Sequence, residues 1–266
     1  MKKNYFIIIV LIFLINWANS QSILKGNYGI NNAKFFNSPP VNGDYLYFSF
    51  LNQAFSENKE KRYIMNCLNE IAKFISLEIE FNSYDQTFGS FLLSDRKITA
   101  TGDSAITLEV VDYVKIAGSV GSKQGDITIV KILKKDLAKV WVKYNPFEFP
   151  EFNFYIDNKI LSNGAPAWFQ NPPNTDGYIF GVGVYQNDSR PSYLVQKADI
   201  EARTNIIKSI KSVVNSEVRD LIINNFEMTS YYANQKSKSS LAGSYIVRRY
   251  FDEKKKIAYS LAVYKY

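Results

Sequence analysis

Histidine is absent from the 266-residue chain, and Cys67 is its only cysteine. Without histidine, neither a Ser-His-Asp nor a Cys-His catalytic arrangement can form, and a histidine-based zinc site is excluded. A single cysteine cannot form an intrachain disulfide or a thiolate metal site, so the fold has to depend on its apolar core. We therefore expect no catalytic residues, no metal and no cofactor. Paired carboxylates, as in glycosidases, are the one hydrolytic chemistry left open.

Acidic residues are fewer than basic ones, 25 against 32, and the formal net charge is +7. A modest positive charge favours anionic partners such as lipopolysaccharide, wall polymer or acidic proteins. The lysines are scattered, so we expect no binding to nucleic acid. The one basic run, Lys254–Lys256, lies between two strand-like segments and is predicted to be a solvated hairpin turn.

Two lysines near the N-terminus precede an unbroken apolar run, Tyr5–Ile15. This run is shorter than the about 20 residues of a transmembrane helix and fits the about 7–15 of a signal-peptide core. The small residues of Ala18–Ser20 predict cleavage between Ser20 and Gln21, with an uncleaved membrane anchor as the alternative. The cleaved protein would have no cysteine for a lipid anchor and no transmembrane helix. We expect it to be exported to the periplasm, the outer membrane or the cell exterior.

Two stretches of the sequence resemble each other, Ala33–Phe50 and Pro166–Gly183. They align without gaps when their residue numbers differ by 133. The identical pairs are Phe36 and Phe169, Pro39 and Pro172, Pro40 and Pro173, and Tyr45 and Tyr178.

A helical pattern of apolar residues, at steps of three or four, follows each stretch. Cys67 lies beside the first of these stripes, so we expect a buried and unreactive thiol. Asn187–Ser189 and Pro191 supply start signals for the second helix. The stripes comprise Ile64, Leu68, Ile71, Ile75 and Ile79 in the first copy, and Ala198, Ala202, Ile206, Ile210, Val213, Val214, Val218 and Leu221 in the second.

Two strand-like runs follow each predicted helix, and the last of them shows a clear period of two. The runs are Thr107–Ile116 and Ile127–Leu133 in the first copy, joined by Ala117–Asp126, and Tyr245–Phe251 and Ile257–Tyr264 in the second, joined by Asp252–Lys256.

These elements predict an α+β fold of two tandem β-α-β-β repeats, each a long helix packed on a small antiparallel sheet. The predicted divisions are a signal peptide at 1–20, a first, diverged repeat at 21–143, a linker at 144–164 and a second repeat at 165–266. A three-stranded sheet with one bare apolar face is marginal, so we expect the copies to pack together or the protein to oligomerise. The linker, rich in Phe, Tyr, Asn and Pro, is expected to lie along the surface as an ordered strap.

Four short motifs mark the second copy: PAWFQNPP at Pro166–Pro173, YIFGVG at Tyr178–Gly183, ADIEAR at Ala198–Arg203 and RRYFD at Arg248–Asp252. With these motifs, residues 164–266 resemble the LPP-twenty family of small bacterial envelope lipoproteins, and look similar to the N-terminal domain of the flagellar assembly protein T. The resemblance implies an α+β fold, an outer-membrane or periplasmic setting and a structural or assembly role without catalytic residues. Family members are often lipidated, whereas this chain has no cysteine for that modification.

We interpret the motif residues as structural. Gly181 and Gly183 lack the third glycine of a dinucleotide fingerprint, and are expected to let another segment approach a strand closely. Trp168 and the turn that follows it are expected to seal the strand's beginning against the helix, with a recognition surface as the alternative. Arg203 is expected to form an ion pair or to bind a carbonyl. The set is Trp168, Asn171, Pro172, Pro173, Tyr178, Gly181, Gly183, Ala202 and Arg203.

The leading hypothesis is a non-enzymatic, exported cell-envelope protein that acts through protein–protein association. Its partners would be envelope or outer-membrane-associated proteins, or a second copy in a homo-oligomer. The alternative is a binding module for cell-wall polymer, surface glycan or another anionic ligand. The positive charge and the 19 tyrosines and 19 phenylalanines suggest this alternative, although a core role explains aromatic residues equally well.

Overall fold

The computed structural model describes residues 24–28, 33–53, 59–88, 91–122, 124–186, 188–216 and 236–266. The predicted signal peptide and its cleavage site between Ser20 and Gln21 lie outside these residues, as do Val218 and Leu221 of the second stripe. Within the described residues the fold is α+β, as predicted, and its strands form three small sheets.

The first sheet has the strand order β1-β5-β6-β2. β2 (Tyr45–Asn52) pairs antiparallel with β6 (Gly125–Leu133), which pairs antiparallel with β5 (Lys115–Ser122). β1 (Leu24–Tyr28) adds a parallel strand on the outer edge of β5. The helix α3 (Lys59–Ile75) packs against β2 and β6 and buries its apolar stripe there.

The second sheet has the order β7-β10-β9. β10 (Ile257–Lys265) is central and pairs antiparallel with both β7 (Tyr178–Tyr185) and β9 (Tyr245–Asp252). The helix α7 (Pro191–Ser216) packs on β7 and β10. Both closing strands predicted from the sequence are confirmed, and the lysine run between them is an exposed turn in which Lys256 has φ 55°.

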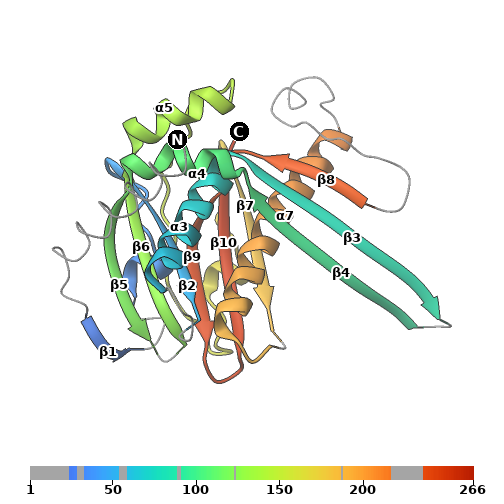
Figure 1. The fold of residues 1–266 in the computed structure, drawn as a ribbon. Coiled ribbons are helices and arrows are strands. Elements are labelled where there is room, and N and C mark those ends of the chain that lie inside the picture. Colours follow the sequence, from blue (N-terminus) through green and yellow to red (C-terminus); the bar gives the residue numbers. More distant parts are fainter. Residues whose placement is uncertain are drawn as a thin grey trace.

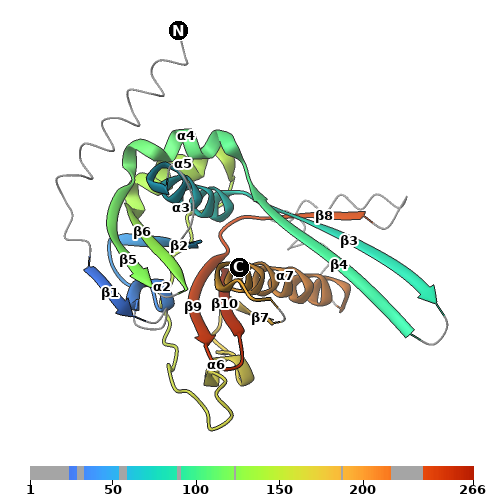
Figure 2. The ribbon, with the colours of Figure 1, turned by 60° about the horizontal axis from the view of Figure 1, so that its bottom comes forward.

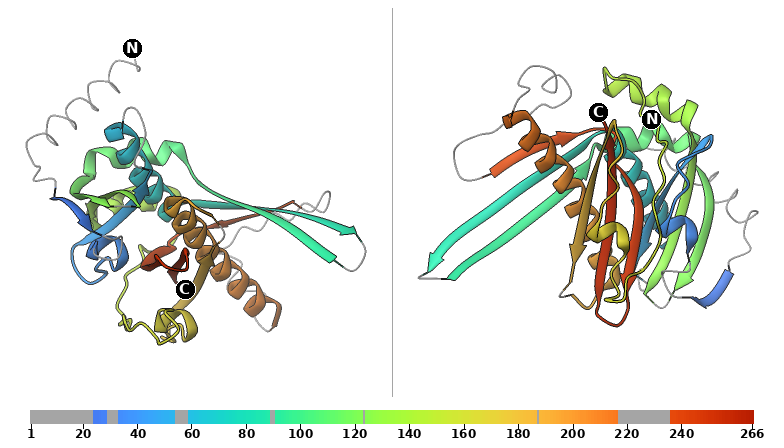
Figure 3. Two further views of the ribbon diagram at one scale, coloured as in Figure 1. Left: turned by 90° about the horizontal axis from the view of Figure 1, so that it is seen from below. Right: turned by 180° about the vertical axis from the view of Figure 1, so that it is seen from behind.

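The two sheets lie side by side, with α3 and α7 over the same face (Figures 1 and 3). They meet where β2 runs beside β9, and we call this contact the seam. No strand ladder joins β2 to β9. Instead the backbone N–H of Tyr47 donates to the Tyr245 hydroxyl at 3.2 Å, and that hydroxyl donates to the carbonyl oxygen of Tyr47.

A third sheet, with the order β4-β3-β8, carries a long hairpin. β3 (Leu77–Phe88) and β4 (Phe91–Gly102) pair along their full length and project away from the rest of the molecule (Figures 1 and 2). β8 (Lys236–Leu241) pairs with β3 only as far as Asn82. The prediction that Ile79 continues the first helical stripe is therefore wrong. The helix ends at Ile75, and Ile79 lies in β3.

The predicted strand at Thr107–Ile116 is also wrong over most of its length. Residues there form the helix α4 (Ser104–Val110) and the short 3-10 helix η2 (Val111–Tyr113), and β5 begins only at Lys115. The Asp103 side chain caps α4 by accepting a hydrogen bond from the Ala105 N–H at 2.8 Å. Burial of apolar residues one helical turn apart then outweighs the strand preference of the β-branched residues.

Residues 145–166 follow the helix α5 (Lys134–Tyr144) and run along the face of the second sheet opposite α7 (Figure 3). We call this segment the strap. Its regular pairing is a single bridge between Ile160 and Pro166, yet Phe152 and Ile156 are buried. The strap thus covers, within one chain, the sheet face that was expected to need a second copy or an oligomer.

The largest core cluster unites both sheets and the strap around Phe74 of α3, which has no exposed surface. Aromatic pairs of this kind add stability beyond the area that they bury. The ring centroids nearest to that of Phe74 belong to Trp141 at 5.6 Å, Phe48 at 5.8 Å, Phe149 at 5.9 Å, Tyr245 at 6.1 Å and Phe152 at 6.5 Å.

Candidate functional site

Gly181 and Gly183 lie where β7 crosses α7. A Cβ atom on Gly181 would lie 2.1 Å from the carbonyl oxygen of Ala202, and one on Gly183 would lie 2.1 Å from that of Ala198. Only glycine allows a strand to approach helix backbone so closely. The close approach expected at these glycines is present, and they sit inside a strand rather than in a phosphate-binding loop.

Arg203 forms the ion pair expected of it. Its Nη2 donates to Glu70 Oε2 at 3.0 Å, and Lys73 Nζ donates to Glu70 Oε1 at 2.6 Å. All three side chains are buried between α3 and α7. Burial alone would raise the pKa of the Glu70 carboxyl, but Lys73 and Arg203 outweigh it and hold the pKa at about 2. The pair joins the two sheet-and-helix units, because one partner comes from each.

A second buried ion pair crosses the seam. Arg249 Nη2 donates to Asp199 Oδ2 at 2.9 Å, and its Nη1 donates to Ser49 Oγ and the Phe36 carbonyl oxygen, both at 3.0 Å. Ser260 also donates to Asp199. Burial works against the Arg249 charge, but the neighbouring carboxylates outweigh it and raise the pKa of Arg249. This guanidinium binds β2, β9 and α7 together, so its role is to fix the units against each other.

Trp168 does not seal the strand against the helix, and that part of the prediction is wrong. It is buried in the short helix α6 (Ala167–Gln170), in the cluster that holds Tyr259 and Leu261 of β10. The alternate residues of β10, such as Ala262, cluster with α7 instead. Because side chains alternate along a strand, Trp168 covers the opposite face.

The other motif residues after Trp168 fix the course of the backbone from the end of α6 to β7. The Asn171 N–H donates to the Ala167 carbonyl oxygen at 2.9 Å and ends α6, while Asn171 and Pro172 are exposed and Pro173 is half-buried. The Tyr178 hydroxyl accepts from the Asn153 N–H at 3.0 Å and donates to the Glu151 carbonyl oxygen at 3.1 Å. Tyr178 therefore fastens the strap to β7.

Cys67 is fully buried and donates to the Thr128 carbonyl oxygen at 3.4 Å. Burial, and then the nearby Glu70 charge, raise the pKa of the thiol. This is the unreactive thiol expected from the sequence. In the part of the chain that the structure describes, acidic and cysteine side chains form no group of three or more suited to a metal ion. None of the described helices is both long and apolar enough to cross a membrane.

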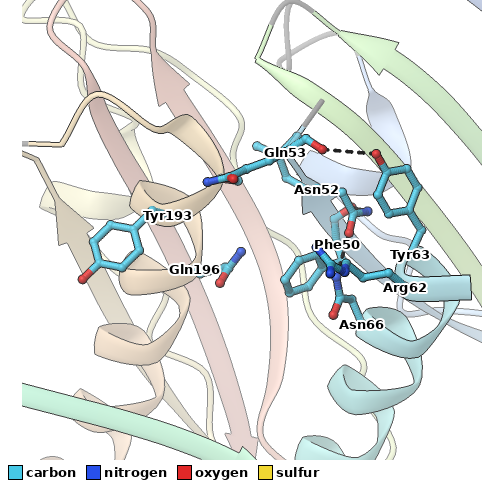
Figure 4. A pocket seen from close by; sticks show the side chains of 10 residues that line it. Phe50, Asn52, Gln53, Arg62, Tyr63, Asn66, Tyr193 and Gln196 are labelled. Carbon is cyan, nitrogen blue, oxygen red and sulfur yellow. Dashed lines mark hydrogen bonds between the residues drawn. The ribbon is translucent and has the colours of Figure 1, made fainter. Parts of the chain in front are cut away.

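A polar pocket of about 280 Å³ lies between the N-terminal halves of α3 and α7, at one end of the seam (Figure 4). Both units contribute to it: β2 and α3 from the first, α7 from the second. Its lining residues are Phe50, Leu51, Asn52, Gln53, Arg62, Tyr63, Asn66, Ser192, Tyr193 and Gln196.

Hydrogen bonds hold the first-unit wall of this pocket in place. Asn66 Nδ2 donates to Asn52 Oδ1 at 2.8 Å. The Tyr63 hydroxyl is 3.0 Å from Asp126 Oδ2 and 3.2 Å from the Gln53 carbonyl oxygen. Burial, followed by the hydrogen bond to Asp126, raises the pKa of Tyr63 to about 12. These side chains are therefore oriented before any ligand arrives.

The hairpin is a second candidate site, because it presents strand edges. β4 is the outer strand of its sheet, and past Asn82 β3 pairs with β4 alone within the described residues. Unpaired strand edges are templates for pairing with another chain. The last paired residues of the hairpin are Phe88 and Phe91. Aromatic residues therefore flank Gly89 and Ser90 in the sequence.

Sequence reasoning missed both the hairpin and the pocket. The hairpin had a usable signal, since Gly89-Ser90 separates two runs rich in strand-forming residues. The pocket had no usable signal in the sequence. Its polar residues come from three elements far apart in the chain, and each looks like an ordinary surface position.

Comparison of the chain with protein-family models, with curated proteins and with solved structures found no match. The resemblance to the LPP-twenty family accordingly stays a prediction from the motifs.

Proposed function

We propose that this protein is a non-enzymatic, exported component of the cell envelope that acts by associating with other envelope or outer-membrane proteins. The projecting hairpin of β3 and β4 is the observation that supports this most. A two-stranded hairpin is marginally stable by itself in water, so such an arm is best understood as one that gains a partner.

The geometry of the arm favours strand addition as the mode of association. Beyond β8, β3 continues from Ser83 to Phe88, where β4 is its only partner among the described residues. At about 3.3 Å per residue, that is about 20 Å of strand whose other edge no described residue pairs with. An extended segment of a partner can pair with such an edge through backbone hydrogen bonds, while side chains supply specificity.

The proposal includes two tandem β-α-β-β repeats, the second being LPP-twenty-like. In both units the first strand pairs with the last, and the last strand is central. The strands β2 and β7 begin at Tyr45 and Tyr178, and the short helices α2 (Lys34–Asn37) and α6 precede them at the same offset. A non-catalytic role agrees with the absence of histidine from the sequence and with the burial of Cys67.

Shortening the arm tests the proposal. Asn82 is paired with Lys97, so an Asn-Gly turn replacing residues 83–96 would close the hairpin there and keep the pairing with β8. The tagged wild-type and shortened proteins would be cross-linked in intact cells, captured, and their partners identified by mass spectrometry. We expect the wild type to capture a specific envelope protein and the shortened protein to lose it, with the unfolding midpoint unchanged.

Tyr155→Ser is the matched control, since this side chain is 84% exposed on the strap and far from the arm in sequence. It should keep the captured partner. Equal capture by the shortened protein would contradict the role of the arm, and capture of nothing by the wild type would contradict association as the function.

A further inference from the structure

The polar pocket between α3 and α7 has a chemistry of its own, apart from the hairpin. Four of its lining side chains are amides: Asn52, Gln53, Asn66 and Gln196. Three more, Tyr63, Ser192 and Tyr193, carry hydroxyls. Among the lining residues that the structure describes, Arg62 is the only charged one, and none carries a carboxylate. A lining rich in amides and hydroxyls, with one cation, suits a ligand that is mostly uncharged hydrogen-bonding groups and carries a single negative charge.

Several of these groups have no partner among the residues that the structure describes. Neither Arg62, Ser192 nor Gln196 makes a side-chain hydrogen bond or ion pair with another described residue. Ser192 as a whole is only 3% exposed. Figure 4 shows Gln196 reaching from α7 towards the side of the pocket where Arg62 and Asn66 lie. Polar side chains from both units therefore line one space.

The beginning of α7 adds a positive potential at the same place. Ser192 is the second residue of this 26-residue helix, and the N-terminal end of a helix carries a partial positive charge. Arg62 faces it from α3. An anionic group bound in the pocket would thus meet a guanidinium on one side and the positive end of a helix on the other.

The size of the pocket limits the ligand. Its volume of about 280 Å³ is near the lower bound of the about 300–1,000 Å³ usual for ligand pockets. That suits one sugar ring with its substituents. A phosphate group alone would leave the amides unpartnered, and phosphate sites commonly supply more than one cation. Phe50 provides an apolar wall for the face of a ring.

We propose that this pocket binds one acidic sugar unit, a pyranose bearing a carboxylate, such as those in anionic surface polysaccharides. Arg62 and the start of α7 hold the carboxylate, while Asn66, Gln196 and Ser192 hold the ring hydroxyls. Because α3 and α7 each supply part of the site, a bound sugar also bridges the two units.

Calorimetric titration of the mature full-length protein with methyl β-glucuronide and methyl β-glucoside tests this assignment. These probes share one ring and differ in the carboxylate. We expect the glucuronide to bind at least tenfold more tightly. Arg62→Gln should abolish that preference by weakening the glucuronide alone, and Gln196→Ala should weaken both sugars. Lys139→Gln is the matched control, since Lys139 lies on α5, pairs with Asp136 and is outside the lining. It should change neither affinity.

The contrary results are equally specific. Absence of glucuronide binding at millimolar concentration would overturn the proposal, as would a preference that survives Arg62→Gln. Inorganic phosphate that competes with the glucuronide at equal affinity would show an anion site without sugar recognition, and would also overturn it. The protein with the shortened arm should bind the glucuronide normally, so failure of this site and failure of the association proposal can be told apart.

Discussion

The two sheet-and-helix units both pair their last strand with the strand that precedes the helix, but they hold their helices at different depths. In the second unit, Gly181 and Gly183 let α7 rest against the backbone of β7. At the same offset of 133, the first unit has Phe48 and Phe50, and these rings belong to the cluster under α3. Glycine brings a helix onto a strand, and phenylalanine holds it away.

The difference explains where the large side chains and the open space are found. Under α3, the distance that Phe48 maintains is filled by Phe74 and the aromatic cluster around it. Phe50, nearer the other end of β2, lines the pocket instead. The second unit has no such room, and small residues such as Ala198 and Ala202 face its strand. Phe48 and Phe50 of β2 thus account for the deep core and the pocket wall of the first unit.

The largest effect is expected from emptying the deep core. Phe74→Ala should lower the free energy of unfolding by about 3–5 kcal/mol. Ile207 occupies the offset position in α7 and is equally buried, but the loss of its smaller side chain should cost about 1 kcal/mol less. Urea denaturation of both variants gives the comparison. An equal or larger loss for Ile207→Ala would show that the units do not differ in this way.

A smaller effect, about 3 kcal/mol, is expected from filling the close contact in the second unit. Gly183→Val places side-chain atoms against the helix backbone, which cannot move away cheaply, so the loss should be at the upper end for overpacking. Gly118→Val in β5 is the control, since nothing lies within 4 Å of a Cβ there. If the two variants unfold at the same urea concentration, the close approach is not required.

The ion pair between the units should give an effect of similar size that depends on pH and is visible in the pH dependence of stability. The pKa of Glu70 is about 2 in the folded protein and 4.5 ordinarily, so its contribution is present above about pH 4.5 and lost as the pH falls towards 2. At about 1.4 kcal/mol per pH unit, the loss is up to roughly 3 kcal/mol. Glu70→Gln should be less stable at pH 7 and lose this part of the slope between pH 5 and 2. An unchanged slope would contradict the assignment.

The periodic patterns of the sequence predicted those helices and strands that bury a single face. The apolar steps of α3 and α7 and the alternation of β10 each reflect one buried face. The strand predicted at Thr107–Ile116 failed because a cap at Asp103 and burial on the helical face outweighed β-branched composition. Arg203 could be picked out in the sequence, but its partner Glu70 could not, because their pairing depends on how two helices lie across a seam.

The seam itself has a consequence for how the protein can change. In an ordinary sheet, neighbouring strands are joined by backbone groups that every residue type supplies, so no single substitution can detach them. Here the hydrogen bonds between β2 and β9 are made by the side chains of Tyr245 and Arg249. A single substitution at either residue can therefore weaken these hydrogen bonds without removing a backbone hydrogen bond from either sheet, so the relative placement of the halves can change through one side chain.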